Sequence, residues 1–174
     1  MERNKVVLVN RDDAPIAEMN KLEAHQRGLL HRAFSIFIVN SRGEMLLQQR
    51  AADKYHGGGL WTNACCSHPQ WGEDILQSAA QRLQYEMGMN CELQQLFTFI
   101  YRANVENNLI EHELDYVCIG FTDAKPVVNK AEVQNYRWIS PEMLVKKLHS
   151  HPEIFTTWFK MVAETVIAEL MKRA

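Results

Sequence analysis

An amphipathic pattern in residues 73–87 constrains the fold more than any other stretch of this 174-residue chain. Leu76, Ala79, Leu83 and Met87 repeat at intervals of three and four residues, which predicts a helix with one apolar face. Gly88 follows directly and is expected to end the helix as its C-cap. Because such a face is stable only when it is covered, other elements of the chain must pack against it.

Runs rich in branched and aromatic residues predict strands on both sides of this helix. They cover residues 5–10, 34–39, 45–49, 95–102, 113–122 and 136–139. The turn-forming residues 40–43 predict that the second and third runs form a hairpin. Ser140 and Pro141 predict the start of a helix that runs toward His149, and apolar spacing predicts a final helix over residues 152–172.

The composition predicts one cytosolic domain that spans residues 1–174. Apolar residues make up 47% of the chain and charged residues 23%, which suits one well-filled core. A net charge of -2 gives no long-range attraction to nucleic acid or to a membrane surface, and no apolar run suits a signal peptide or a membrane span. Four cysteines, two of them adjacent, make a poor disulfide framework. We therefore expect reduced thiols and a small-molecule ligand.

A cysteine and a histidine stand two residues apart in segment 63–69, downstream of three consecutive glycines. A cysteine is nucleophilic or binds metal as the thiolate, and two features favour that anion at Cys66. One is the helix that begins just beyond the motif, and the other is any metal held by His68. The alternative is that Cys65 and Cys66 are small buried apolar residues, as most free cysteines are.

Five side chains are candidate ligands of one metal ion: His25, His31, His68, Glu111 and Glu113. His25 and His31 are six residues apart, so they share an ion only if the chain between them forms a loop. Glu111 and Glu113 lie on the same face of a strand and repel each other unless a cation lies between them. The mixed set suits zinc, manganese or iron(II) better than calcium. Surface histidines and a solvated strand face are the alternatives.

Four basic residues are candidates for binding an anionic group: Lys21, Arg50, Lys54 and Arg82. Glu86 would carry Mg²⁺ against phosphate oxygens, although Arg82 and Glu86 also have the spacing of an ordinary ion pair within a helix. Tyr101 is able to relay a proton, and Trp158 lies beside the apolar stripe of the last helix, where the core is its simplest place. Residue chemistry alone predicts a metal-assisted proton transfer on a small phosphorylated ligand.

Four stretches resemble type 1 isopentenyl-diphosphate delta-isomerases, in the same order along the chain. They are residues 61–69 (WTNACCSHP), 85–88 (YEMG), 101–103 (YRA) and 111–113 (EHE). The resemblance implies the Nudix fold, an α/β (α+β) single domain with a mixed β-sheet flanked by helices. It also implies interconversion of isopentenyl and dimethylallyl diphosphate, in isoprenoid biosynthesis, by an antarafacial proton shift through a tertiary carbocation.

The resemblance implies a role for each candidate residue. Cys66 and Glu113 are the acid–base pair on opposite faces of the substrate, and Tyr101 assists Glu113. A divalent metal, Mn²⁺ or Zn²⁺, is bound by His25, His31, His68, Glu111 and Glu113, and Mg²⁺ by Glu86 and the Cys66 carbonyl. The diphosphate is bound by Lys21, Arg50, Lys54 and Arg82. Either Trp61 or Trp158 shields the carbocation, for which a desolvated aromatic ring supplies roughly 2 kcal/mol or more.

The Nudix helix motif is only partly kept. Its first glycine falls on Ser67, and its acidic positions fall on Glu73, Arg82, Tyr85 and Glu86. A Nudix hydrolase uses the acidic cluster to hold the ions that activate water, so Arg82 and Tyr85 disfavour hydrolysis. Hydrolysis of another small diphosphate and an inert metal-binding module remain the alternatives, and the chain is expected to work as a monomer or a homodimer.

Overall fold

Nine strands and four α-helices form the part of the chain that the computed structural model describes, residues 3–173, so the outermost residues of the predicted domain lie outside it. The strands are β1 (Lys5–Val9), β2 (Pro15–Asn20), β3 (His31–Val39), β4 (Met45–Arg50), β5 (Trp61–Thr62), β6 (Cys65–Ser67), β7 (Leu93–Val105), β8 (Leu109–Phe121) and β9 (Val133–Ile139). The helices are α1 (Lys21–Arg27), α2 (Ile75–Met87), α3 (Pro141–Ser150) and α4 (Thr157–Arg173), with short 3₁₀ turns η1 (Glu106–Asn108) and η2 (Pro152–Ile154). None of these helices is long and apolar enough to cross a membrane.

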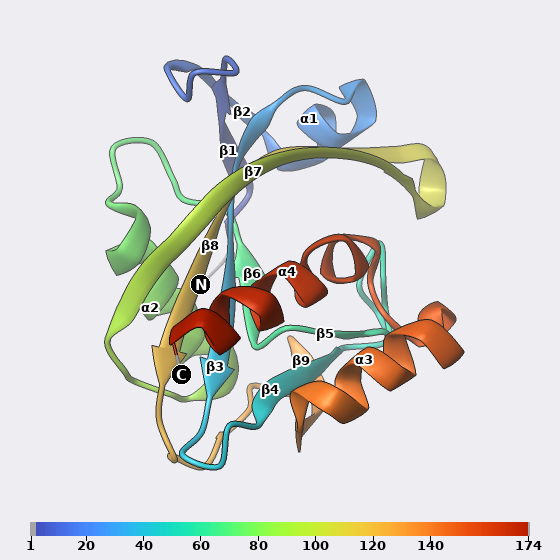
Figure 1. Cartoon of the computed structure of the whole chain (residues 1–174). Coiled ribbons are helices and arrows are strands. Elements are labelled where there is room, and N and C mark those ends of the chain that lie inside the picture. Colours follow the sequence, from blue (N-terminus) through green and yellow to red (C-terminus); the bar gives the residue numbers. More distant parts are fainter. Residues whose placement is uncertain (1–2, 174) are drawn as a thin grey trace.

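Strand β3 is the centre of one mixed sheet (Figure 1). It runs parallel to β8, from the pair His31 and Glu113 to the pair Val39 and Phe121, and antiparallel to β6. Strands β7 and β8 form a long antiparallel hairpin with η1 at its tip. The register places the ends of β3, β6 and β8 side by side, and these ends carry most of the candidate ligands.

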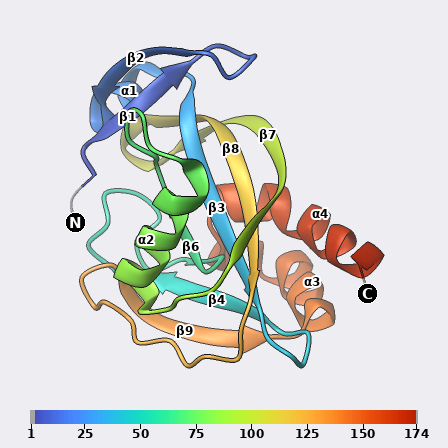
Figure 2. The same ribbon diagram turned by 90° about the vertical axis from the view of Figure 1, so that its left-hand side faces the viewer.

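Helices cover both faces of the sheet and enclose two apolar cores (Figure 2). Alternation along β3 sends Phe34 and Ile36 toward α2, where they pack with Leu83, and sends Phe37 toward α4, where it stacks on Phe159. Burying a large apolar side chain contributes about 1.5–3 kcal/mol, so these layers hold the sheet in place. The mixed sheet flanked by helices is confirmed.

Helix α2 confirms the amphipathic pattern and its cap. It begins at Ile75, two residues later than predicted, because the Asp74 side chain accepts a hydrogen bond from the Gln77 amide as the N-cap. It ends at Gly88, whose φ of 63° lies in the left-handed region that favours glycine. A Cβ at Gly88 would lie 2.5 Å from the Val127 carbonyl oxygen, so the glycine also admits the segment that precedes β9.

The predicted hairpin of residues 34–49 is correct only at its turn. Val39 and Met45 pair, after which β4 leaves β3 and pairs along its length with β9. The single helix predicted for residues 152–172 is wrong at its start. The chain is extended at Phe155, which bridges to Trp61, and the Thr156 amide donates to the Trp61 carbonyl at 3.0 Å before α4 begins. These pairings are long-range, so helical spacing in the sequence does not reveal them.

Candidate active site

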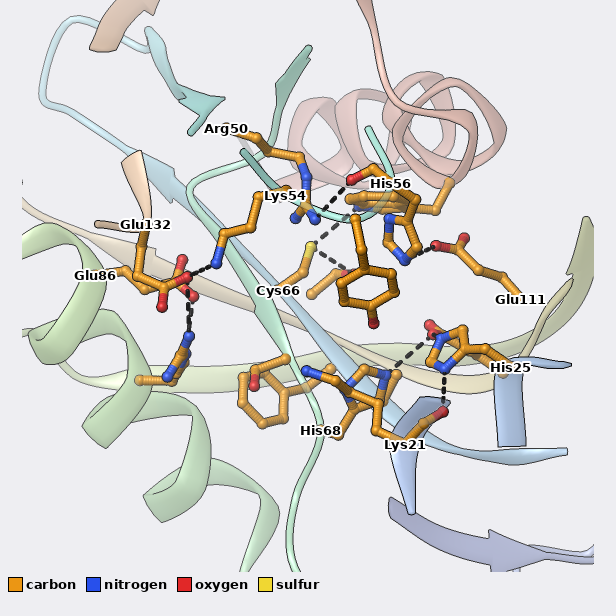
Figure 3. Close-up of a pocket in the computed structure, with 18 of the residues that line it drawn as sticks. Lys21, His25, Arg50, Lys54, His56, Cys66, His68, Glu86, Glu111 and Glu132 are labelled. Atoms are coloured by element: carbon orange, nitrogen blue, oxygen red, sulfur yellow. Dashed lines mark hydrogen bonds and ion pairs between the residues drawn. The ribbon is translucent and has the colours of Figure 1, made fainter. Parts of the chain in front are cut away.

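One cavity gathers most of the candidate residues (Figure 3). Its lining includes Lys21, His25, Arg50, Lys54, Cys66, His68, Arg82, Glu86, Tyr101, Glu111, Glu113 and Trp158. His31 is fully buried beside it. Trp61 is not part of this lining and lies 5.9 Å from the guanidinium of Arg137, measured to its ring centre. The structure therefore brings together every predicted site residue except Trp61.

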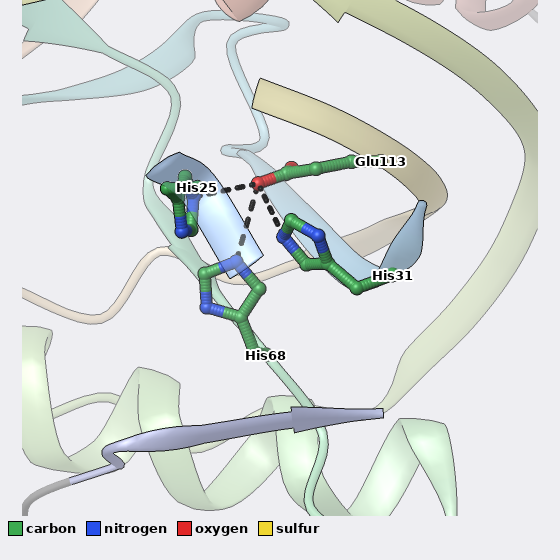
Figure 4. Close-up of side chains that lie close together, drawn as sticks. All are labelled: His25, His31, His68 and Glu113. Carbon is green, nitrogen blue, oxygen red and sulfur yellow. Dashed lines mark hydrogen bonds and ion pairs between the residues drawn. The ribbon is translucent and has the colours of Figure 1, made fainter. Parts of the chain in front are cut away.

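Three imidazoles, those of His25, His31 and His68, surround one carboxylate oxygen of Glu113 (Figure 4). We call these four residues, together with Glu111, the metal end of the cavity. The Nε2 atoms of His25, His31 and His68 lie 3.7, 3.4 and 3.2 Å from Oε1 of Glu113. Neighbouring donors on a common ion lie roughly 3 Å apart when each metal–donor bond is about 2.1 Å. The donor atoms of the three histidines and Glu113 therefore have spacings close to those of a metal centre.

Local structure turns the first two histidines toward that point. His25 lies in the last turn of α1, Gly28 ends the helix with a φ of 64°, and His31 opens β3. The chain between the two histidines thus leaves the helix at Gly28, as a shared ion requires. A Cβ at Gly28 would approach Ile110 to 3.1 Å, so glycine also relieves a close contact with β8.

The tautomers of His25 and His31 leave nitrogen lone pairs available for a metal. Nδ1 of His25 donates to the Lys21 carbonyl at 2.7 Å, and Nδ1 of His31 donates to the Leu29 carbonyl at 2.8 Å. Their buried Nε2 atoms have no hydrogen-bond partner among residues 3–173. Ligating histidines commonly donate their other ring N–H to a backbone carbonyl, so this group fits a divalent metal ion.

Two buried carboxylates share one phenol at this end. The Tyr101 hydroxyl lies 2.8 Å from Oε2 of Glu113 and 3.1 Å from Oε2 of Glu111. Burial and the neighbouring charge of Glu113 raise the pKa of Glu111 well above its usual value. Burial opposes ionisation of Glu113 too, but the close approach of the three imidazoles, with the hydrogen bond to His68, outweighs it and lowers the pKa of Glu113. One carboxylate of the pair is thus held ionised.

A fourth histidine, which the sequence reasoning missed, completes the surroundings of Glu111. His56 is 8% exposed, and its Nε2 lies 3.2 Å from Oε1 of Glu111. Burial, with the charge of Arg50, lowers the pKa of His56 to about 4, so the ring is neutral at pH 7. His56 lies in the loop between β4 and β5, where no periodic pattern marks it.

The two adjacent cysteines face opposite sides of the sheet. Alternation along β6 buries Cys65 in the core under α2, whereas Cys66 lines the cavity. The Cys66 thiol donates to Oδ1 of Asn63 at 3.1 Å and accepts from Nε1 of Trp158 at 3.2 Å. Trp158 is 6% exposed, so it is a core residue, as its apolar stripe predicts, and also a wall of the cavity.

The surroundings of Cys66 favour the thiol, in line with the buried alternative that the sequence left open. Burial raises its pKa to about 12, and the negative charge of Asp115 adds to the effect. The dipole of α2 does not reverse this, because the helix begins only at Ile75 and its field is confined to its first turn. Asp115 and Ser35 were missed by the sequence reasoning. They are linked at 2.7 Å, and Ser35 Oγ lies 3.5 Å from Cys66 Sγ.

The basic end of the cavity consists of Lys21, Arg50, Lys54 and Arg82. Burial and the positive charges of Lys54 and Arg82 lower the pKa of Lys21, which lines the same cavity. The predicted pair of Arg82 and Glu86 is present at 2.8 Å, but both side chains are buried rather than solvated. Such a cluster suits an anion with several oxygens.

The acidic positions of the Nudix motif do not form a cluster here. Glu73 is 2.7 Å from the Arg3 guanidinium and is absent from the cavity lining, and the Tyr85 ring lies under the Arg82 guanidinium. Of the motif's acidic positions, Glu86 alone places a carboxylate in the cavity. The arrangement of ions that activates water in the hydrolases has therefore lost most of its protein ligands.

Comparison with known proteins identifies the family of this chain. The NUDIX domain family matches residues 29–159. The isopentenyl-diphosphate Delta-isomerase of Serratia proteamaculans is 48% identical, covering 97% of this chain and 94% of its own, and that of Pectobacterium atrosepticum is 49% identical, covering 92% and 90%.

Solved structures share the fold at lower identity. The MutT protein of Methanosarcina mazei Go1 superposes with a TM-score of 0.67 at 18% identity, covering 80% of this chain and 94% of that one. The Nudix hydrolase RenU of M. smegmatis gives a TM-score of 0.58 at 15% identity, covering 95% and 94%. The 48% and 49% identities to the Serratia and Pectobacterium proteins decide the family. The chain belongs to the isopentenyl-diphosphate Delta-isomerases, within the NUDIX domain proteins.

Proposed function

We propose that this cavity interconverts isopentenyl diphosphate and dimethylallyl diphosphate, with Cys66 and Glu113 as its two acid–base groups. The observation that carries the proposal is that a buried thiol and a buried ionised carboxylate line one cavity whose other end is basic. In the forward direction one group adds a proton to the terminal alkene carbon, which leaves a tertiary cation. The other group then removes a proton from the carbon next to the diphosphate-bearing carbon, and the double bond forms there.

A protonated Cys66 suits the cation-forming chemistry. When the thiol gives up its proton, the resulting thiolate already accepts the Trp158 N–H, so no solvent rearrangement is needed to stabilise it. The indole of Trp158 also forms a cavity wall, where it shields the cation from water and contributes roughly 2 kcal/mol or more through its π face. Trp61 lies outside the lining, so we assign the shielding to Trp158.

Glu113 is the proposed partner on the other face of the substrate. Tyr101 donates to one of its oxygens, which fixes the orientation of the carboxylate and gives a route for its proton. The mixed nitrogen and oxygen donors of the metal end would hold Mn²⁺ or Zn²⁺, and the bound ion would supply a fixed positive charge that keeps Glu113 ionised.

The basic end is the proposed diphosphate site. Lys21, Arg50, Lys54 and Arg82 would bind its oxygens, and Glu86 with the Cys66 carbonyl would hold the Mg²⁺ that accompanies it, because hard oxygen donors suit that ion. A thiol acid requires a reducing compartment, which is consistent with a cytoplasmic enzyme. The proposed partner is a small diphosphate, not nucleic acid or a membrane.

Deuterium transfer from solvent tests the proposal. The protein, loaded with a divalent metal, is incubated with isopentenyl diphosphate and Mg²⁺ in deuterated water, and the products are analysed by NMR and mass spectrometry. Deuterium in dimethylallyl diphosphate is the expected result. Release of phosphate or diphosphate without isomerisation would instead support a Nudix hydrolase, and recovery of unlabelled substrate would contradict both activities.

A further inference from the structure

A second carboxylate, Glu132, is built into the basic end of the cavity. Its carbonyl accepts from the Ala51 amide at 2.9 Å, which ties it to the end of β4 beside Arg50. Its amide donates to the Asn129 carbonyl at 2.9 Å, and the Asn129 amide donates to the Glu86 carbonyl at 2.8 Å. The backbone of Glu132 is therefore anchored to both β4, which ends at Arg50, and α2, which carries Arg82.

The Glu132 side chain occupies the place where an anion would contact the cations. It is ion-paired with Lys54 and lies 3.3 Å from the Arg82 guanidinium. Only 16% of the side chain is exposed. Burial opposes its ionisation, but Lys54, Arg82 and Lys21 outweigh burial and lower its pKa, so the carboxylate stays charged.

Two carboxylates thus contact a single guanidinium inside a pocket for a polyanion. Glu86 contacts Nε of Arg82 at 2.8 Å, and Glu132 approaches its Nη2. A metal-free diphosphate that reaches Arg82 and Lys54 must either displace Glu132 or lie against its negative charge. Like charges brought together in a desolvated contact repel each other strongly and weaken binding. A divalent cation between the oxygens removes that repulsion.

We propose that Glu132 makes the basic end selective for a diphosphate that carries Mg²⁺, an inference that rests on the proposed diphosphate site. Its carboxylate repels a metal-free diphosphate, which the four basic side chains alone would bind. It also gives the basic end a second carboxylate besides Glu86, which favours the Mg²⁺ complex. Glu132 is accordingly a specificity-determining residue, distinct from the acid–base pair.

Calorimetric titration of the metal-loaded protein with inorganic diphosphate measures this selectivity directly. Binding is compared in Mg²⁺-containing and Mg²⁺-free buffers of equal ionic strength, and retention of the metal-end ion is checked by elemental analysis. The variants are Glu132→Gln, which removes the charge, and Glu132→Asp, which keeps it. Glu18→Gln is the matched control, because Glu18 pairs with Lys5 at 2.7 Å on the exposed surface.

The wild type, Glu132→Asp and Glu18→Gln are expected to prefer the Mg²⁺ complex by at least about tenfold. Glu132→Gln should bind metal-free diphosphate at least about tenfold more tightly than the wild type does, so that its preference disappears. An unchanged preference in Glu132→Gln, or an equal loss of affinity for both forms, overturns the inference. A wild type that binds both forms equally also overturns it but leaves the diphosphate site intact, whereas a wild type that binds neither refutes both.

Discussion

The two ends of the cavity are built on opposite principles. At the metal end, short side chains on α1, β3 and β8 converge on one point, and backbone carbonyls hold His25 and His31 in place. At the basic end, carboxylates of the same protein hold two of the long side chains, Lys54 in the loop after β4 and Arg82 on α2. The geometry of the metal end thus comes from backbone contacts, and that of the basic end from a balance of charges.

The difference follows from the cost of burying charge. Burial lowers the pKa of His68 to about 3, so this ring is neutral at pH 7 and can be packed in the cavity wall without a charge of its own. Ammonium and guanidinium groups keep their charges and need partners of opposite sign when they are desolvated. A substitution at the metal end should therefore affect chemistry and ion binding, whereas one at the basic end should affect substrate affinity.

The largest effect is expected for substitutions of the two proposed acid–base residues, Cys66 and Glu113. Cys66→Ala removes the thiol, and Glu113→Gln replaces the carboxylate with an amide, so each variant loses one of the two proposed proton-transfer groups. We expect kcat to fall by about 10²–10⁴-fold or more in each, with little change in affinity for the substrate. Rates come from the deuterium assay, and circular dichroism verifies that the variants fold. A Cys66→Ala variant with near-normal kcat would show that the thiol is not an acid–base group.

At the basic end, Lys54→Met should act mainly on substrate binding. The variant loses a charge-assisted contact worth about 1.5–3 kcal/mol, which corresponds to a rise in KM of roughly 10–150-fold with a smaller change in kcat. Steady-state kinetics with isopentenyl diphosphate separate the two parameters. Lys160→Met, which removes an exposed lysine of α4, is the control and should leave both unchanged. A fall in kcat alone would mean that the two ends are not functionally separate.

His56→Gln tests whether contacts around the metal end contribute to metal affinity, because it leaves all five predicted ligands in place. His56 contacts Oε1 of Glu111, and loss of such an outer contact typically weakens metal binding by about 10–100-fold. Competition with a fluorescent chelator measures the affinity for Mn²⁺ or Zn²⁺. His149→Gln, in an exposed pair with Glu164, is the matched control. Equal metal affinity in the two variants would show that His56 only fills space.

The sequence predicts residues that share a short motif better than residues joined by the fold. The amphipathic helix, its cap at Gly88 and the pair Glu111 and Glu113 follow from local spacing, and the structure agrees with each. His56 and Glu132 lie in loops and enter the cavity only through pairings of β4 with β5 and β9. Long-range pairing of this kind has no periodic signal in the chain.

The protonation of Cys66 likewise depends on contacts that local sequence does not reveal. Proximity along the sequence placed it near a helix terminus and a metal-binding histidine, both of which favour a thiolate. The pKa depends instead on burial among residues distant in sequence, including Asp115 and Trp158. The sequence motifs therefore predict which residues lie in this site, whereas the packing around each residue determines its pKa.

The smallest effect is expected for Cys65→Ala, which tests the separation of the two sheet faces. Cys65 is fully buried between β6 and α2, on the face away from the metal end, so losing its sulfur should lower the free energy of unfolding by about 1 kcal/mol. Activity should persist, since alternation along β6 keeps Cys66 in the cavity whatever residue precedes it. Chemical denaturation measures the first quantity and the deuterium assay the second. An inactive but folded Cys65→Ala protein would show that the proton transfer had been assigned to the wrong thiol. The proposed difference between the two faces of β6 would then also be wrong.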